Sequence, residues 1–255
     1  MADTDWVSAL LRAYPTLTAR HVEIVEHLVN GFTKSVDATQ YRTDFISTSE
    51  FEHLSGRLIA HHATSSNPLK KENFEHALEA AFTLEGKNVP PTDDPTRRGA
   101  DLVVDGLRIS LKTCSRKAKP LTSMDVSKFA ECRWLREPLQ RKDASEINRL
   151  MKAALNSHLQ DYEKIIMFCN GVVGKFVTYK MIEIPKSIFQ IANIIGDRDF
   201  ATCLLKGTQT LTIPLLQNGS KVASLSLDGS VEKMRFLGIN VGSCMLHAEW
   251  KVELP

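Results

Sequence analysis

The sequence predicts an α/β protein in which a mixed β-sheet is flanked by helices, between a helical N-terminal region and a C-terminal β-meander. Apolar residues recur at helical spacing in residues 4–34 and 47–62. Helix and strand patterns then alternate over residues 70–184. Four β-rich runs close the chain, and Asn-Gly at 218–219 and Asp-Gly at 228–229 mark turns between three of them.

Length and composition are those of one large domain. The chain has 255 residues, 43% of them hydrophobic, which is enough material for a sizeable core. We expect a single domain over 1–255, with a helical region (1–66), a core (67–184) and a β-rich extension (185–255). The net charge of +2 permits a nucleic-acid partner without demanding one.

The chain carries no signal for a membrane or for secretion. No apolar run approaches the ~18 residues of a transmembrane helix, and the N-terminus lacks the basic lead-in of a signal peptide. The five cysteines form no Cys-x-x-Cys pair. We therefore expect free thiols in a reducing cytoplasm.

The middle of the chain contains the clearest elements. Phe74, Leu78 and Phe82 form one apolar stripe over residues 70–86, which predicts an amphipathic helix. The remaining expected elements are helices at 123–136 and 143–160, strands at 164–169 and 176–184, and a short helix within 185–195.

Residues 100–113 predict a β-hairpin. Two β-rich runs flank Asp105-Gly106, a strong two-residue turn signal. A tight turn there pairs position 101 with about position 110, and Lys112 lies just beyond on the same face as Ser110. The hairpin therefore brings the carboxylate of Asp101 near the amine of Lys112.

A carboxylate beside a lysine suits phosphodiester hydrolysis. The carboxylate holds a divalent cation against the phosphate, and the lysine orients water and stabilises the growing charge. Mg²⁺ needs few protein ligands, because it keeps several waters. Glu75 borders the apolar stripe of the preceding helix and is the natural third member.

Here the chain resembles the PD-(D/E)xK nuclease superfamily, and within it the type II restriction endonucleases. The residues that carry the likeness are Asn73-Phe74-Glu75, Gly99-Ala100-Asp101 and Ser110-Leu111-Lys112. The resemblance implies a restriction-endonuclease-like core, with Asp101 as metal-binding acid, Lys112 as catalytic lysine and Glu75 as helical acid. It also implies that the carbonyl of Leu111 is a metal ligand.

Two residues depart from the family pattern. Ala100 stands where the family often has Pro, and Ser110 replaces the second acid within the catalytic set. A serine supplies no charge, so another acid must complete the site. The alternatives are Asp125 or Glu131, which we place on the helix expected at 123–136, and Glu75.

Basic residues flank the proposed site on both sides. Each of them is a candidate for contacts to DNA phosphates: Arg97, Arg98, Arg116, Lys117 and Lys119.

We expect a Mg²⁺-dependent, sequence-specific endonuclease of duplex DNA in a prokaryotic cytoplasm. A palindromic site has two-fold symmetry, so we also expect a homodimer. Two alternatives remain: a repair or junction-resolving nuclease on the same fold, and a DNA-binding module whose catalytic site has decayed. Ser110 motivates the second alternative.

Overall fold

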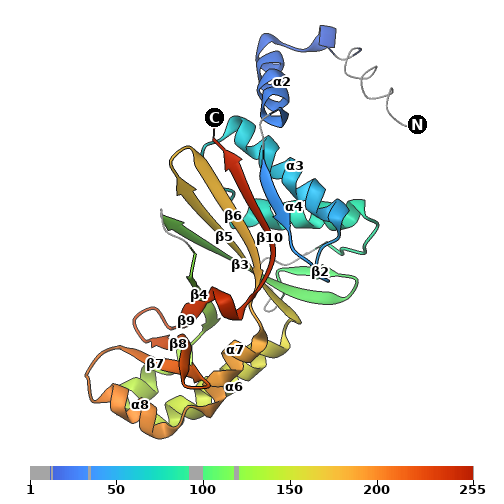
Figure 1. Cartoon of the computed structure of the whole chain (residues 1–255). Coiled ribbons are helices and arrows are strands. Elements are labelled where there is room, and N and C mark those ends of the chain that lie inside the picture. Colours follow the sequence, from blue (N-terminus) through green and yellow to red (C-terminus); the bar gives the residue numbers. More distant parts are fainter. Residues whose placement is uncertain (1–11, 13, 34–35, 92–99, 118–120, 255) are drawn as a thin grey trace.

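The computed structural model describes residue 12 and residues 14–33, 36–91, 100–117 and 121–254, without the side chains of residues 32, 116 and 117. These residues form two β-sheets with helices packed against them (Figure 1). No helix within the described ranges is both long enough and apolar enough to cross a membrane.

The N-terminal part contains a short 3₁₀ helix, η1 (Tyr14–Thr16), and the helix α2 (Ala19–Phe32). Thr18 caps α2 by accepting a hydrogen bond from the backbone of His21. Of the two helices predicted within 4–34, the second is confirmed, and most of the first lies outside the described residues.

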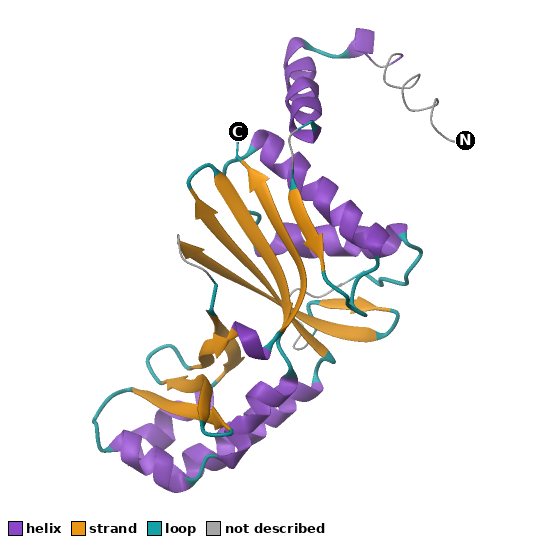
Figure 2. Ribbon diagram, in the orientation of Figure 1, coloured by secondary structure: helices purple, strands orange, loops and turns teal. Residues whose placement is uncertain are grey.

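The larger sheet, called the main sheet, is mixed and has the strand order β1-β10-β6-β5-β3-β2 (Figure 2). Its strands are β1 (Asp37–Gln40), β2 (Leu102–Val104), β3 (Leu107–Lys117), β5 (Lys164–Val173), β6 (Phe176–Glu183) and β10 (Met245–Glu253). Strands β3 and β5 are parallel, and the other neighbouring pairs are antiparallel. The predicted mixed sheet is therefore confirmed.

Two helices cover one face of the main sheet, α3 (Thr48–Thr64) and α4 (Lys71–Leu84). The predicted stripe on α4 is buried, and the ring of Phe74 stacks on Phe168 of β5 with centroids 3.9 Å apart. This packing fixes α4 against the sheet and so sets the position of the helix start.

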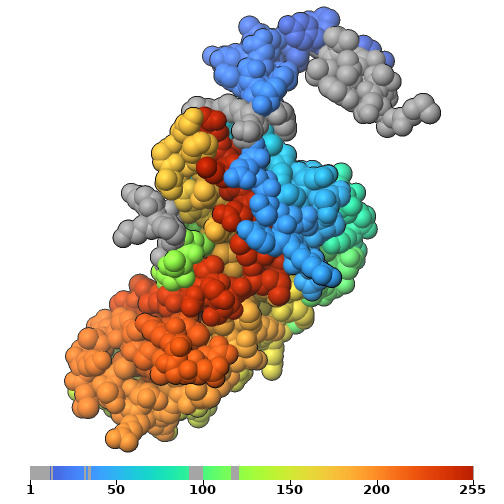
Figure 3. Space-filling model, viewed as in Figure 1, coloured from blue at the N-terminus to red at the C-terminus, as the bar shows by residue number. Residues whose placement is uncertain are grey.

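The second sheet has the strand order β4-β9-β8-β7. It lies at the end of the molecule opposite to α2 (Figure 1). Its strands are β4 (Ser123–Glu131), β7 (Thr210–Gln217), β8 (Ser220–Asp228) and β9 (Lys233–Asn240). Its neighbouring helices are η2 (Arg133–Leu135), α5 (Arg136–Arg141), α6 (Ala144–Gln160), α7 (Lys186–Gln190), η3 (Ile191–Ile194), α8 (Asp197–Leu204) and η4 (Val241–Ser243). Together they form the lower lobe of the molecule (Figure 3).

The helix predicted at 123–136 is wrong in its first two thirds. Residues 123–131 form strand β4, and only short helical turns follow. Met124 and Val126 are buried on one face, with the period of two that a strand requires. Their backbone pairs with β9, more than a hundred residues away, and such a distant partner leaves no local signal.

The predicted C-terminal strands are present. Strands β7, β8 and β9 pair in succession and form the expected meander. The fourth, β10, leaves them and enters the main sheet between β1 and β6. Helix α8 and strand β1 were not predicted.

Candidate active site at the open edge of the main sheet

The hairpin turn places Asp101 as the sequence predicted. Asp105 and Gly106 have φ values of +50° and +83°, the left-handed pair of a tight hairpin turn. Leu102 pairs with Ile109, and the Asp101 amide donates to the Ile109 carbonyl at 2.8 Å. Asp101 therefore lies beside Ser110, immediately before β2 begins at Leu102.

One oxygen of Asp101 is held by the neighbouring strand. Its Oδ2 accepts hydrogen bonds from the Leu111 amide at 2.6 Å and from Ser110 Oγ at 3.2 Å. The Lys112 ammonium lies 3.8 Å from the same oxygen. The Ser110 hydroxyl thus holds the Asp101 carboxylate and adds no negative charge of its own.

Strand β3 is open along this edge. Strand β2 pairs only with Leu107–Ile109, so the rest of β3 has no strand neighbour on that side among the described residues. The N–H and C=O groups of one strand residue point to the same side. Because the Leu111 amide points to Asp101, the Leu111 carbonyl also faces the open edge.

Helix α4 brings Glu75 and Lys71 to this edge. The Lys71 Nζ atom lies 2.8 Å from Asp101 Oδ1 and 2.9 Å from Glu75 Oε1, and so bridges the two carboxylates. Burial lowers the pKa of Lys71, but the hydrogen bonds and charges of Asp101 and Glu75 outweigh it and raise the pKa overall. Lys71 was not among the residues predicted from the sequence, although it lies one turn before Glu75 at ion-pair spacing.

Lys112 is the more buried of the two lysines. Burial lowers its pKa, and the charge of Lys71 acts in the same direction, whereas Asp101 raises it. The charge of Lys112 also acts on His158 of helix α6. Burial is the largest cause that lowers the pKa of His158 to about 4, and the Lys112 charge is the second. His158 is therefore neutral at pH 7 and adds no positive charge beside Lys112.

A groove of about 210 Å³ lies next to the carboxylates. It is lined by Lys71, Lys112, Thr113, Asp125, Val126, Ser127 and Lys128. Asp125 reaches this groove from strand β4 and not from the predicted helix, and its Oδ1 accepts the Gly238 amide at 2.6 Å. Glu131 is further along β4, does not line the groove, and forms an ion pair with Lys128 at 2.7 Å.

The donor set at the open edge fits a hard divalent cation. Two carboxylates, of Glu75 and Asp101, already share one cationic group, and the Leu111 carbonyl faces the same side. Glu75 Oε1 is shielded from solvent and has the Lys71 ammonium beside it but no well-aligned hydrogen bond. Among the described residues no three His, Cys, Asp or Glu side chains lie where they could hold one metal ion together, so water would complete the coordination.

The predicted phosphate contacts lie largely outside the described structure. Arg97, Arg98 and Lys119 belong to segments that are not described, and Arg116 and Lys117 are described in backbone only, at the end of β3. Lys128, which sequence reasoning did not select, lines the groove. Its position on β4 explains the omission, because that strand was expected to be a helix.

Comparison with known proteins finds relatives that match most of the chain. A family model described as SmaI, type II site-specific deoxyribonuclease, matches residues 10–252. The type II restriction enzyme SmaI of Serratia marcescens is 27% identical over 232 residues, which cover 86% of this chain and 87% of that enzyme. A solved restriction endonuclease in complex with substrate DNA aligns with 75% of this chain and with 76% of its own chain, at a TM-score of 0.35 and 13% identity.

The family match includes α4, the hairpin and both sheets, and it confirms the resemblance to type II restriction endonucleases. The chain belongs to the SmaI family of type II site-specific deoxyribonucleases.

Proposed function

We propose that this deoxyribonuclease cuts duplex DNA with Mg²⁺ held at the open edge of β3 by Glu75, Asp101 and the Leu111 carbonyl. One observation carries the proposal: two carboxylates from separate elements meet around a single cationic group, with Lys112 beside them. A bound Mg²⁺ neutralises phosphate charge and activates water. The protein supplies the fixed geometry.

Each side chain has a distinct role in this proposal. Asp101 is held by the β3 backbone, so it presents Oδ1 in a fixed direction. The Lys112 ammonium orients the attacking water and stabilises the charge that grows on the phosphate. The groove receives the phosphate, and Lys128 at its rim adds a phosphate contact.

We propose Glu75 as the acid that replaces the missing second carboxylate. Its oxygen is joined to Asp101 through one ammonium group, with both contacts under 3 Å. Asp125 also faces the groove, but one of its oxygens is committed to the Gly238 amide. Glu131 is paired with Lys128.

We further propose that the enzyme acts as a homodimer, because two strands of a symmetric site require two catalytic centres. Helix α2 supports this, since it projects beyond the main sheet (Figure 3). Its Ile24 and Val29 side chains are about half exposed. Light scattering on the purified protein measures the mass directly.

The test is incubation of the protein with long mixed-sequence duplex DNA, in Mg²⁺ or in chelator, beside Lys112→Ala. Discrete fragments that need Mg²⁺ and Lys112 support the proposal. Cleavage of branched DNA alone would favour a junction-resolving enzyme. Intact DNA that the protein demonstrably binds would instead indicate a decayed binding module.

A further inference from the structure

Lys71 occupies a position that the proposed function assigns to a metal ion. Its ammonium lies between Asp101 Oδ1 and Glu75 Oε1, at 2.8 and 2.9 Å. All three side chains are partly buried, with exposed fractions of 33% for Lys71, 25% for Glu75 and 22% for Asp101. Water therefore screens these charges less than it would at an open surface.

We propose that Lys71 is a tethered cation that fills the metal position in the metal-free enzyme and withdraws when the divalent ion binds. This inference rests on the proposed function, because it takes Glu75 and Asp101 as metal ligands. Lys71 then competes with the metal and lowers its apparent affinity.

Charge balance supports the exchange. Two half-buried carboxylates repel each other unless a cation lies between them, and in the metal-free state Lys71 supplies it. A divalent ion at the same place would add two charges beside Lys112, which is already 3.8 Å from Asp101. The Lys71 ammonium cannot share that space, because the carboxylate oxygens it contacts become metal ligands.

The structure provides a place for the displaced ammonium. Lys71 begins helix α4 and also lines the groove, whose other charged lining residues are Lys112, Lys128 and Asp125. Its flexible four-carbon chain lets the ammonium turn toward that groove without moving the helix. There it would face the phosphate, so the charge released by metal binding would be used in DNA binding.

A merely structural role makes a different prediction. A lysine that only strengthens the first turn of α4 through its i,i+4 contact with Glu75 would affect folding, and not metal affinity. Metal affinity measured without DNA therefore separates the two roles, and no cleavage occurs in that assay.

The experiment is a calorimetric titration of the protein with Mn²⁺, which shares the oxygen ligands of Mg²⁺, in the absence of DNA. Lys71→Met is compared with wild type and with Lys70→Met, which removes the same charge from the adjacent exposed residue, one that forms no ion pair with Glu75 or Asp101 in the described structure. Asp101→Asn reports whether the heat comes from this site.

We expect Lys71→Met to bind Mn²⁺ about tenfold more tightly than wild type, because the competitor is gone. Lys70→Met should stay within about twofold of wild type. In chelator, Lys71→Met should melt at a lower temperature than wild type, and Mn²⁺ should raise its melting temperature by more.

Two other outcomes overturn the inference in different ways. Equal Mn²⁺ affinity of wild type and Lys71→Met, with binding abolished by Asp101→Asn, rejects the competing lysine and leaves the metal site standing. Binding that Asp101→Asn does not weaken, or no binding by any variant, rejects the metal site itself and the inference with it.

Discussion

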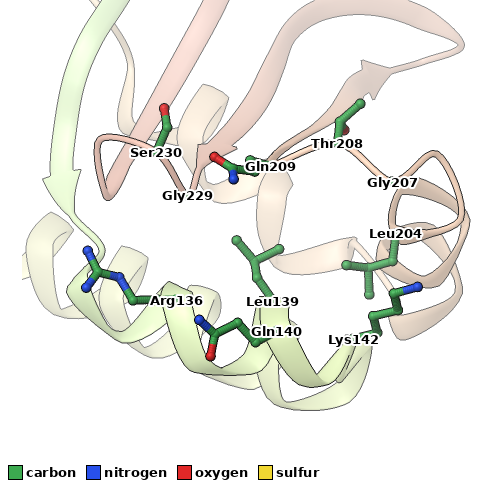
Figure 4. Close-up of a pocket in the computed structure, with 10 residues that line it drawn as sticks. All are labelled: Arg136, Leu139, Gln140, Lys142, Leu204, Gly207, Thr208, Gln209, Gly229 and Ser230. Carbon is green, nitrogen blue, oxygen red and sulfur yellow. The ribbon is translucent and has the colours of Figure 1, made fainter.

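The protein has two hollows of different size, and the smaller one adjoins the acidic and basic side chains that catalysis needs. The larger, of about 510 Å³, lies in the lower lobe between α5 and the turns at 207–209 and 229–230 (Figure 4). Its ten lining residues include no acid and no histidine, and its Arg136 is paired with Glu232 at 2.7 Å. The smaller groove is lined by three lysines and Asp125, and it adjoins the carboxylates of Glu75 and Asp101. Converging charges, and not volume, mark the place where phosphodiester chemistry fits.

Asp101→Asn should give the largest effect. The amide cannot supply a charged metal ligand, so we expect cleavage to fall by more than about 10³-fold. The measurement is single-turnover cleavage at saturating enzyme. Asp105→Asn in the same hairpin is the control, because asparagine tolerates the positive φ of that turn. Equal losses in both variants would show damage to the hairpin and not to a metal site.

Lys112→Met should have the next largest effect on cleavage. Loss of a positioned cation at the reacting phosphate reduces kcat by about 10²- to 10³-fold. DNA affinity should change by much less, which gel-shift titration measures. A variant that cuts normally would remove the catalytic role of this lysine and leave the groove as a binding surface only.

The pKa of His158, on helix α6 of the lower lobe, depends on the charges of Lys112 and Asp101 at the proposed site. Burial lowers its pKa in the folded state to about 4, from an ordinary value of 6.5, so the unfolded chain binds more protons between pH 4 and 6.5. Stability from this group is complete above pH 6.5 and should fall by about 3 kcal/mol as the pH drops to 4. The groups that set this pKa, after burial, are Lys112, Asp161 and Asp101.

Urea unfolding of wild type and His158→Phe at several pH values measures this contribution. The phenylalanine ring keeps the packing against Phe129 and Tyr162 but cannot titrate. The variant should lose less stability between pH 6.5 and 4 than wild type. Parallel curves for the two proteins would contradict the assignment.

The larger pocket should give the smallest effect. We expect the double change Arg136→Ala and Gln140→Ala to leave the cleavage rate within about twofold, because neither residue adjoins the carboxylates. The same single-turnover assay measures it. A large loss of cleavage rate would contradict the distinction between the two hollows and would indicate that the larger pocket contributes to DNA binding.

The part of the site that sequence predicted is local in the chain. The hairpin from Asp101 to Lys112 depends on a two-residue turn, and the helix with Glu75 depends on its apolar stripe. Both signals lie within about fifteen residues, where periodicity and turn chemistry act directly. These elements were therefore correct before any tertiary contact was known.

The parts that sequence missed depend on distant partners. Strand β4 exists because β9 pairs with it, with Ser123 opposite Asn240. Asp125 therefore lies on a strand, where the sequence predicted a helix. Strand β10 enters the main sheet from the end of the chain in the same way. The bridging role of Lys71 required the relative position of α4 and the hairpin, which only packing defines. The single domain over 1–255 stays a prediction.

The most direct test of the central claim is the position of the metal. Crystals of the enzyme with duplex DNA and Mn²⁺ allow the ion to be located by its anomalous scattering. We predict Mn²⁺ coordinated by Glu75, Asp101 and the Leu111 carbonyl, with Lys112 beside the phosphate. An ion held elsewhere, without Asp101 among its ligands, would contradict the account.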